Sequence, residues 1–280
     1  MKSKGGNRRP LSADDDIEQA PSLKETAQTA SSSYTLSYAD RDFLVSDEVR
    51  GVRLMLEDLK PELVMQQEDI ESTVVVFGSA RIPAPETGTD VTAESSPLQH
   101  YYDEARRFGR LLSEFAKSQQ PLRCVVMTGG GPGIMEAANR GASDVDAKSI
   151  GLNIVLPKEQ APNVYSTPEL SFQFHYFALR KLHFLLRAKA LVVFPGGFGT
   201  LDELFETLTL LQTRRIHPMP VLLFGKPFWD KIVDFEALVE FGVIERADLD
   251  LFHYVDSAEQ AVEIIRQKID SEPNHPPASD

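Results

Sequence analysis

Cysteine is almost absent from this sequence, which holds Cys124 alone among its 280 residues. A single thiol cannot form a disulfide within the chain, which suits a reducing compartment. The neighbouring residues 125–127 are apolar, so we interpret Cys124 as a buried strand residue and not as a reactive thiol. A chain of this length, 42% hydrophobic, needs neither a disulfide nor a metal to fold.

Basic residues are also scarce, since 29 Lys and Arg face 42 Asp and Glu, for a formal net charge of −13. Proteins that bind nucleic acids neutralise the phosphates with Lys and Arg, so this excess of acidic residues argues against a broad nucleic-acid-binding surface. No apolar run approaches the roughly 20 residues that a membrane span requires, and the N-terminus lacks an apolar signal core. We expect a cytoplasmic protein without a nucleic-acid or membrane partner.

Several familiar cofactor and catalytic fingerprints are missing. A Gly-x-Gly-x-x-Gly motif would need glycine at positions where Ile134 and Asp202 stand, and no Gly-Lys-Ser/Thr tripeptide occurs. No Cys or His cluster has metal-ligand spacing, and no Gly-x-Ser-x-Gly elbow is present. These absences argue against a nicotinamide dehydrogenase and a P-loop NTPase, and we predict no metal and no cofactor.

Four regions are predicted along the chain. Residues 1–38 are polar and are interpreted as a disordered tail that can be deleted without loss. Residues 39–72 form an N-terminal helical extension, with a helix from Asp47 to Leu59 that ends before Pro61. Residues 73–270 form one α/β domain, and residues 271–280 form a second, shorter tail.

Apolar runs alternate with amphipathic segments through the α/β domain. Strands are predicted at 73–77, 122–127, 150–156, 190–194, 220–224 and 253–255. Helices are predicted at 99–117, 132–144, 176–189, 200–214, 228–240 and 257–269. This alternation predicts a Rossmann-like, doubly wound parallel sheet with helices on both faces. Such sheets bind ligands beyond the carboxyl ends of their strands.

Three of the predicted strands end in glycine. The turns contain Gly78 and Ser79; Gly129, Gly130, Gly131 and Gly133; and Gly196, Gly197 and Gly199 followed by Thr200. Glycine lets backbone N–H groups approach a ligand closely, and each following helix presents its positive end. A tight strand-to-helix connection is the alternative explanation, above all for Gly78. Two glycine-rich turns in one sheet favour a phosphate-binding site.

Two charged positions have both a structural and a functional interpretation. Thr200 and Glu203 have the spacing of a capping box, in which Glu203 would bond the Thr200 N–H. Alternatively, the Glu203 carboxylate lies in the first turn and faces whatever the glycine turn holds, while Asp202 turns away. Arg180 and Lys181 lie either on a solvated helix stripe, as Arg187 and Lys189 are expected to, or at the mouth of the site, where an arginine fork would clamp phosphate. His175 is interpreted as a lining or capping residue and not as a base.

These residues resemble the Lonely Guy (LOG) family. The segment from Pro195 to Glu203 is similar to that family's Pro-Gly-Gly-x-Gly-Thr-x-x-Glu signature, and Arg180-Lys181 resembles its Arg-Lys pair, 23 residues before Glu203. Residues 129–137 and 77–81 resemble glycine turns of the longer bacterial members. The resemblance covers roughly residues 74–270.

The resemblance implies a nucleotide 5′-monophosphate phosphoribohydrolase that releases the base from AMP or cytokinin nucleotides. It implies Arg180 and Glu203 as catalytic residues, and Lys181, Glu136 and the glycine turns as substrate-binding residues. It also implies a homodimer or higher homo-oligomer. Family members often carry a lysine decarboxylase label, but no lysine here lies in a recognisable pyridoxal phosphate site. A non-catalytic nucleotide or cofactor carrier on the same fold and a nicotinamide oxidoreductase are the alternatives.

Overall fold

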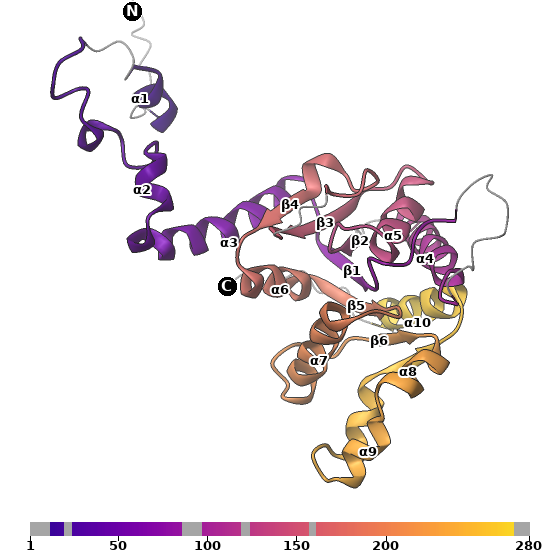
Figure 1. Cartoon of the computed structure of the whole chain (residues 1–280). Coiled ribbons are helices and arrows are strands. Elements are labelled where there is room, and N and C mark those ends of the chain that lie inside the picture. Colours follow the sequence, from indigo (N-terminus) through magenta and orange to yellow (C-terminus); the bar gives the residue numbers. More distant parts are fainter. Residues whose placement is uncertain (1–11, 20–23, 86–96, 119–123, 157–160, 272–280) are drawn as a thin grey trace, which may run out of the picture. The chain divides into compact units, whose positions relative to one another are not determined.

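The computed structural model describes residues 12–19, 24–85, 97–118, 124–156 and 161–271 (Figure 1). Residues 1–56 and 57–280 form two separate units, each described by itself. The second unit carries the sheet and all of the predicted site residues. None of the helices in the described ranges is long and apolar enough to cross a bilayer.

The first unit is built from short helices. It contains α1 (Ala13–Gln19), η2 (Ser32–Tyr34), α2 (Arg41–Val45), η3 (Asp47–Val49) and the beginning of α3 (Arg50–Gln67). The first two lie in the segment expected to be disordered, so that segment contains local structure. It forms from local capping, as where the Ser12 amide donates to Asp15 at 2.7 Å. None of the described side chains in 12–38 is buried, and the dispensability of the segment stays a prediction.

Helix α3 runs through Pro61, so the prediction that a helix ends before this proline is wrong. An internal proline removes one backbone hydrogen bond and crowds the preceding turn. Here Pro61 and Met65 are buried, and burial of this face offsets the local cost. Tertiary packing therefore extends the helix to Gln67.

Seven strands in the described residues form one parallel sheet, which confirms the predicted fold class. Their order is β4-β3-β2-β1-β5-β6-β7, with bounds β1 Ser72–Phe77, β2 Cys124–Thr128, β3 Ser149–Ile154, β4 Ser171–Phe174, β5 Ala188–Val193, β6 Val221–Phe224 and β7 His253–Val255. The sequence interpretation missed β4, a four-residue edge strand whose Gln173 is exposed. Residues 122–123, expected to begin the second strand, lie outside the described residues.

Helices cover both faces of the sheet. They are α4 (His100–Ser118), α5 (Ile134–Ser143), α6 (Phe177–Leu186), α7 (Phe198–Gln212), α8 (Lys226–Ile232), α9 (Phe235–Glu240) and α10 (Ala258–Ser271), with η4 (Pro168–Leu170) and η5 (Arg246–Leu251) in connections. Val74 and Val76 of β1 pack in one cluster with residues of α4, α5 and α10. Val75 and Phe77 pack in the other, with residues of α6, α7 and α8. This alternation is what the two-residue period of a strand produces.

All six predicted helices of the α/β domain differ by at least one residue from the observed bounds, and three of the differences move a named residue or divide a helix. Helix α6 ends at Leu186, and Lys189 lies in β5 and not on the helix. Helix α7 begins at Phe198, two residues earlier than expected. The predicted helix 228–240 is divided into α8 and α9, because Asp234 accepts the Ala237 amide at 2.9 Å and begins a new helix.

Strand β1 lies between β2 and β5. Val76 of β1 is opposite Thr128 of β2, and Phe77 of β1 is opposite Val193 of β5. The chain proceeds from β1 toward one edge of the sheet and from β5 toward the other. The gap between β1 and β5 is therefore the switch point, where open parallel sheets bind ligands. Cys124 is buried in β2, and burial raises the pKa of its thiol to about 12, as expected for a structural cysteine.

Candidate functional site

The three glycine turns meet at the carboxyl ends of β2, β1 and β5. Ser79 joins them, because its amide donates to the Pro195 carbonyl at 3.0 Å and its carbonyl accepts the Ile134 amide at 3.1 Å. The first turn is thus bonded to the third turn on one side and to the start of α5 on the other. The structure brings together these three segments, which are spread over more than one hundred residues of sequence.

Gly133 is a position that only glycine fits. Its φ is +73°, and a Cβ there would lie 2.3 Å from the carbonyl oxygen of Ser79. Left-handed backbone and a close approach of two main chains both require the absence of a side chain. This glycine therefore lets the second turn pack directly on the first.

A buried polar network holds the second glycine turn. Thr128 Oγ1 donates to Asn139 Oδ1 at 2.7 Å and accepts the Gly130 amide at 3.0 Å. Asn163 Nδ2 donates to the carbonyls of Gly130 and Gly131, each at 3.1 Å. The sequence interpretation missed Asn139 and Asn163. Their signal was weak, because an asparagine on a helix or in a loop rarely indicates burial.

The third turn leads directly into α7. Gly197 is the residue before the first helical position, and no side chain caps this end. A Cβ at Gly197 or Gly199 would meet nothing within 4 Å, so open space lies beside the turn. Thr200 is buried against Gly196. An uncapped helix N-terminus beside open space is suited to an anionic ligand.

The capping-box interpretation of Glu203 is wrong. Because α7 begins at Phe198, Thr200 is already its third residue and Glu203 lies in the second turn. Glu203 is only 9% exposed. Burial raises the pKa of its carboxyl to about 7, against the opposing effect of the Lys181 and Arg180 charges. A carboxyl that titrates near neutral pH is a common feature of catalytic sites.

Arg180 is held against the sheet and does not lie on a solvated stripe. Its Nε donates to the Leu152 carbonyl at 2.7 Å, and its guanidinium lies 5.0 Å from the Phe184 ring centre. A Cβ at Gly129 would stand 2.6 Å from Nη2, so the second glycine turn leaves room for this side chain. Burial lowers the pKa of Arg180 and the charge of Glu203 opposes that shift, so the two groups interact.

Lys181 pairs with carboxylates of α7. Its Nζ lies 2.8 Å from both Asp202 Oδ2 and Glu206 Oε2, and its side chain is 17% exposed. Burial lowers the pKa of Lys181, but the two carboxylates outweigh that effect and raise it to about 12. The lysine expected to bind substrate thus has two protein partners, and Asp202 faces Lys181. This pairing ties α6 to α7 on either side of Glu203.

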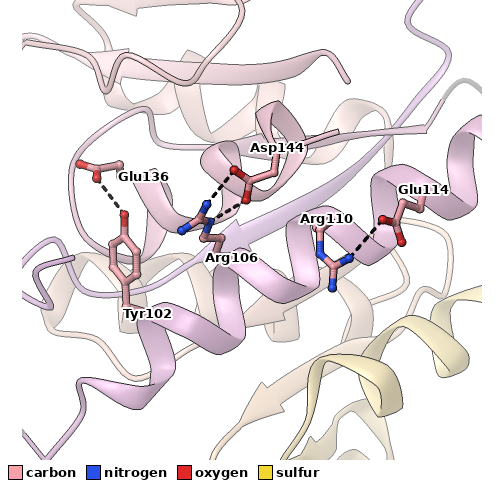
Figure 2. A network of polar contacts seen from close by, with 6 residues as sticks. All are labelled: Tyr102, Arg106, Arg110, Glu114, Glu136 and Asp144. Atoms are coloured by element: carbon pink, nitrogen blue, oxygen red, sulfur yellow. Dashed lines mark hydrogen bonds and ion pairs between the residues drawn. The ribbon is translucent and has the colours of Figure 1, made fainter. Parts of the chain in front are cut away.

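Glu136 accepts a hydrogen bond from Tyr102 at 2.8 Å (Figure 2). Burial, with this bond, raises the pKa of Tyr102 to about 12. Glu136 also lines a pocket of about 460 Å³ together with Pro132 and residues 161–165. The predicted substrate residue Glu136 therefore faces a pocket beside the second glycine turn, with one side of its carboxylate already engaged.

A second pocket, of about 380 Å³, lies along α4. Three arginines line it, and each has a carboxylate partner. Arg106 pairs with Asp144 and Arg110 with Glu114 (Figure 2), and Arg107 pairs with Glu259. With their charges neutralised inside the chain, these arginines do not form an anion site. Within the described ranges, no group of three or more His, Cys, Asp and Glu side chains is placed to hold a metal.

The fold and these side chains define a class of protein. It is a Rossmann-like α/β protein whose three glycine turns meet at the switch point of its sheet, with a buried carboxylate and a fixed arginine on nearby helices. Glycine turns that lead into helix N-termini are suited to anionic ligands.

Comparisons with known proteins agree with this class. Residues 135–265 match the family described as "Possible lysine decarboxylase". The cytokinin riboside 5′-monophosphate phosphoribohydrolase LOG1 of Arabidopsis thaliana is 28% identical over 155 residues, 54% of this chain and 70% of the relative. The probable enzyme LOGL5 of Oryza sativa subsp. japonica is 32% identical over 114 residues, 40% of this chain and 45% of the relative. The matched family model and these relatives support membership of the LOG family.

Solved structures with a similar fold include two proteins that bind the molybdenum cofactor. The binding protein from Rippkaea orientalis has a TM-score of 0.47 and 19% identity, and covers 71% of this chain and 98% of its own. The carrier protein from Chlamydomonas reinhardtii has a TM-score of 0.46 and 20% identity, and covers 72% of this chain and 99% of its own.

Proposed function

We propose that this protein hydrolyses the N-glycosidic bond of purine nucleoside 5′-monophosphates to the free base and ribose 5-phosphate. The buried Glu203 with its raised pKa, coupled to Arg180, is the observation that carries the proposal. The curated relatives support it, since their names give cytokinin riboside 5′-monophosphates as substrates. AMP and cytokinin nucleotides are the substrates we propose.

The site supplies different groups to the two ends of such a nucleotide. The 5′-phosphate is proposed to bind the glycine turns, where Gly197 and Gly199 border open space at the N-terminus of α7. Glu203 lies on that same helix, fewer than two turns further on. A ribose anchored by its phosphate would thus be held near the carboxylate.

Breaking a ribosyl–nitrogen bond develops oxocarbenium character at the anomeric carbon. An ionised Glu203 would stabilise that positive charge and accept a proton from the attacking water. The water oxygen forms the new bond to the anomeric carbon, and the purine leaves with the electron pair of the C–N bond and takes up a proton from solvent. Glu203 then returns the proton it accepted to solvent. Arg180, held by the Leu152 carbonyl, would orient the nucleotide without moving during the reaction.

The proposal is tested by incubating the purified protein with AMP and with isopentenyladenosine 5′-monophosphate. Released base and ribose 5-phosphate are measured by chromatography, and adenosine is the control substrate. We expect release from a monophosphate and far slower release from adenosine, because the phosphate supplies most of the anchoring. Tight binding of both monophosphates without release of either base would contradict the proposal and assign a non-catalytic carrier.

A further inference from the structure

Helix α6, which carries Arg180 and Lys181, has no cap from its own segment. Its N-cap residue is Tyr176, which makes no side-chain capping bond, and no acidic residue lies in its first turn. The first amides of a helix need acceptors, and the positive end of the helix dipole favours a nearby negative charge. Both requirements are met from a distant part of the chain.

Glu57 of α3 supplies the missing acceptor. Its Oε1 accepts the His175 amide at 2.8 Å and its Oε2 accepts the Tyr176 amide at 3.1 Å. The carbonyl of Tyr176 in turn accepts the Arg180 amide at 3.2 Å, within the first turn of α6. One residue, Tyr176, thus links the carboxylate of Glu57 to the backbone of Arg180.

Two more acidic residues of α3 contact α6 further along. Asp58 Oδ1 lies 3.3 Å from His183 Nε2. Burial lowers the pKa of His183, so this contact involves a neutral imidazole. Glu62 pairs with Arg187 at the end of α6, and the hydrogen bond from that guanidinium holds the pKa of Glu62 below its usual range. The segment from residue 57 of α3 onward is therefore bonded to α6 at its beginning and end, and Asp58 contacts His183 between them.

We propose that Glu57 is a positioning residue for Arg180, acting by fixing the first turn of α6. The part of α3 from Glu57 onward thereby supports the site. The kinetic consequence of this inference rests on the proposed function, whereas its effect on α6 does not.

The physical reason is the position of Arg180 within the helix. It is the fourth residue of α6, in the turn that frays when a helix loses its cap. Its Nε meets the Leu152 carbonyl at 2.7 Å, a bond that weakens if the first turn moves by a fraction of an ångström. Catalytic groups require positioning within about 0.5 Å. A frayed first turn would therefore reduce turnover while the rest of the fold stays intact.

The test compares Glu57→Ala with Glu68→Ala. Glu68 follows α3 and pairs with Lys148 at 2.7 Å, so it is a nearby acidic residue whose ion-pair partner lies outside α6. Backbone hydrogen exchange of residues 175–186 is measured in both variants, together with kcat and KM for AMP. We expect faster exchange at residues 175–180 and a kcat lowered roughly five- to tenfold in Glu57→Ala alone, the size of a lost cap.

A double variant separates positioning from general stability. In an Arg180→Ala background, Glu57→Ala should reduce kcat no further, whereas its effect on thermal unfolding should persist. Glu57→Gln, with one acceptor oxygen in place of two, should lie between wild type and Glu57→Ala. Unchanged exchange in α6, or faster exchange with unchanged kcat, would overturn the inference. If wild type releases no base from any monophosphate, the proposed function fails, and the exchange data alone then decide whether Glu57 fixes α6.

Discussion

Arg180 donates from Nε to the carbonyl oxygen of Leu152 at 2.7 Å. This single bond fastens α6 to β3 and brings the guanidinium beside the second glycine turn, where the absent side chain of Gly129 leaves room for it. Arg180 is thereby fixed next to the switch point of the sheet, and its charge interacts with that of Glu203. The local sequence around Arg180 does not identify Leu152, Gly129 or Glu203 as its neighbours.

Replacing this arginine with lysine should nearly abolish the proposed reaction. Arg180→Lys keeps the charge but removes the planar fork that binds the Leu152 carbonyl and spans toward Gly129. We expect turnover of AMP to fall by roughly 10²-fold, or about 3 kcal/mol of barrier. Arg215→Lys, at an exposed position, is the control and should behave as wild type. Similar turnover in the two variants would remove Arg180 from the mechanism.

Glu203→Gln should abolish turnover and leave the fold intact. The change keeps the shape of the side chain but removes a charge needed at the transition state, a loss of about 10²–10³ in kcat. Asp202→Asn is the control, because Asp202 lies one residue earlier on α7 and is largely exposed, and Lys181 keeps its Glu206 partner. Adenine release is measured, with circular dichroism as the check of folding. Near wild-type turnover in a folded Glu203→Gln would refute a catalytic role.

The Glu203→Gln variant should be more stable to thermal unfolding than wild type at high pH. Burial raises the pKa of Glu203 from 4.5 to about 7, so the folded state binds extra protons between these values. Wild-type stability therefore falls as the pH rises from 4.5 through about 7, and glutamine removes this loss. We expect equal stability near pH 4 and a gain of roughly 1–3 kcal/mol for Glu203→Gln at pH 8. Thermal unfolding at both pH values measures this, and a destabilised variant at pH 8 would contradict the raised pKa.

Gly197→Ala should separate ligand binding from folding. A Cβ at Gly197 meets nothing within 4 Å and the φ of −94° suits alanine, so stability should change by less than about 1 kcal/mol. If phosphate occupies the open space, the added methyl group should weaken AMP binding at least tenfold by calorimetry. Gly51→Ala, also free of contacts, is the control for the substitution itself. Unchanged AMP affinity in Gly197→Ala would place the phosphate elsewhere.

The protein should form a homo-oligomer of at least two chains. Helix α6 exposes Phe177, Leu182 and Leu186, each about half accessible, and exposed apolar surface of this kind favours association. Light scattering at micromolar concentration should give at least twice the 31.2 kDa chain mass. Leu182→Glu should shift the protein toward monomer, because a charge at a buried contact is unfavourable. A wild-type monomer would refute the prediction.

The sequence predicted the strands of the sheet centre well, because buried parallel strands such as residues 73–77 are short apolar runs bounded by glycine. The sequence-based prediction failed for features that depend on contacts with residues distant in sequence. Strand β4 has only four residues, with an exposed Gln173, and Pro61 indicates a helix end unless the burial of its own helix face is known. Asn139 and Asn163 hold the second glycine turn, yet their residue types give no sign of burial.

The sequence by itself determined the parallel α/β fold and the three glycine turns, since strand periodicity and the backbone freedom of glycine are local properties. Only the tertiary structure decided what Glu203 and Arg180 do. The bounds of α7 removed the capping interpretation, and burial among residues distant in sequence set the pKa of Glu203. The acceptor at the start of α6 is likewise Glu57, 118 residues before His175. Burial and long-range hydrogen bonds arise only when the chain is folded, so a local pattern of residues does not predict them.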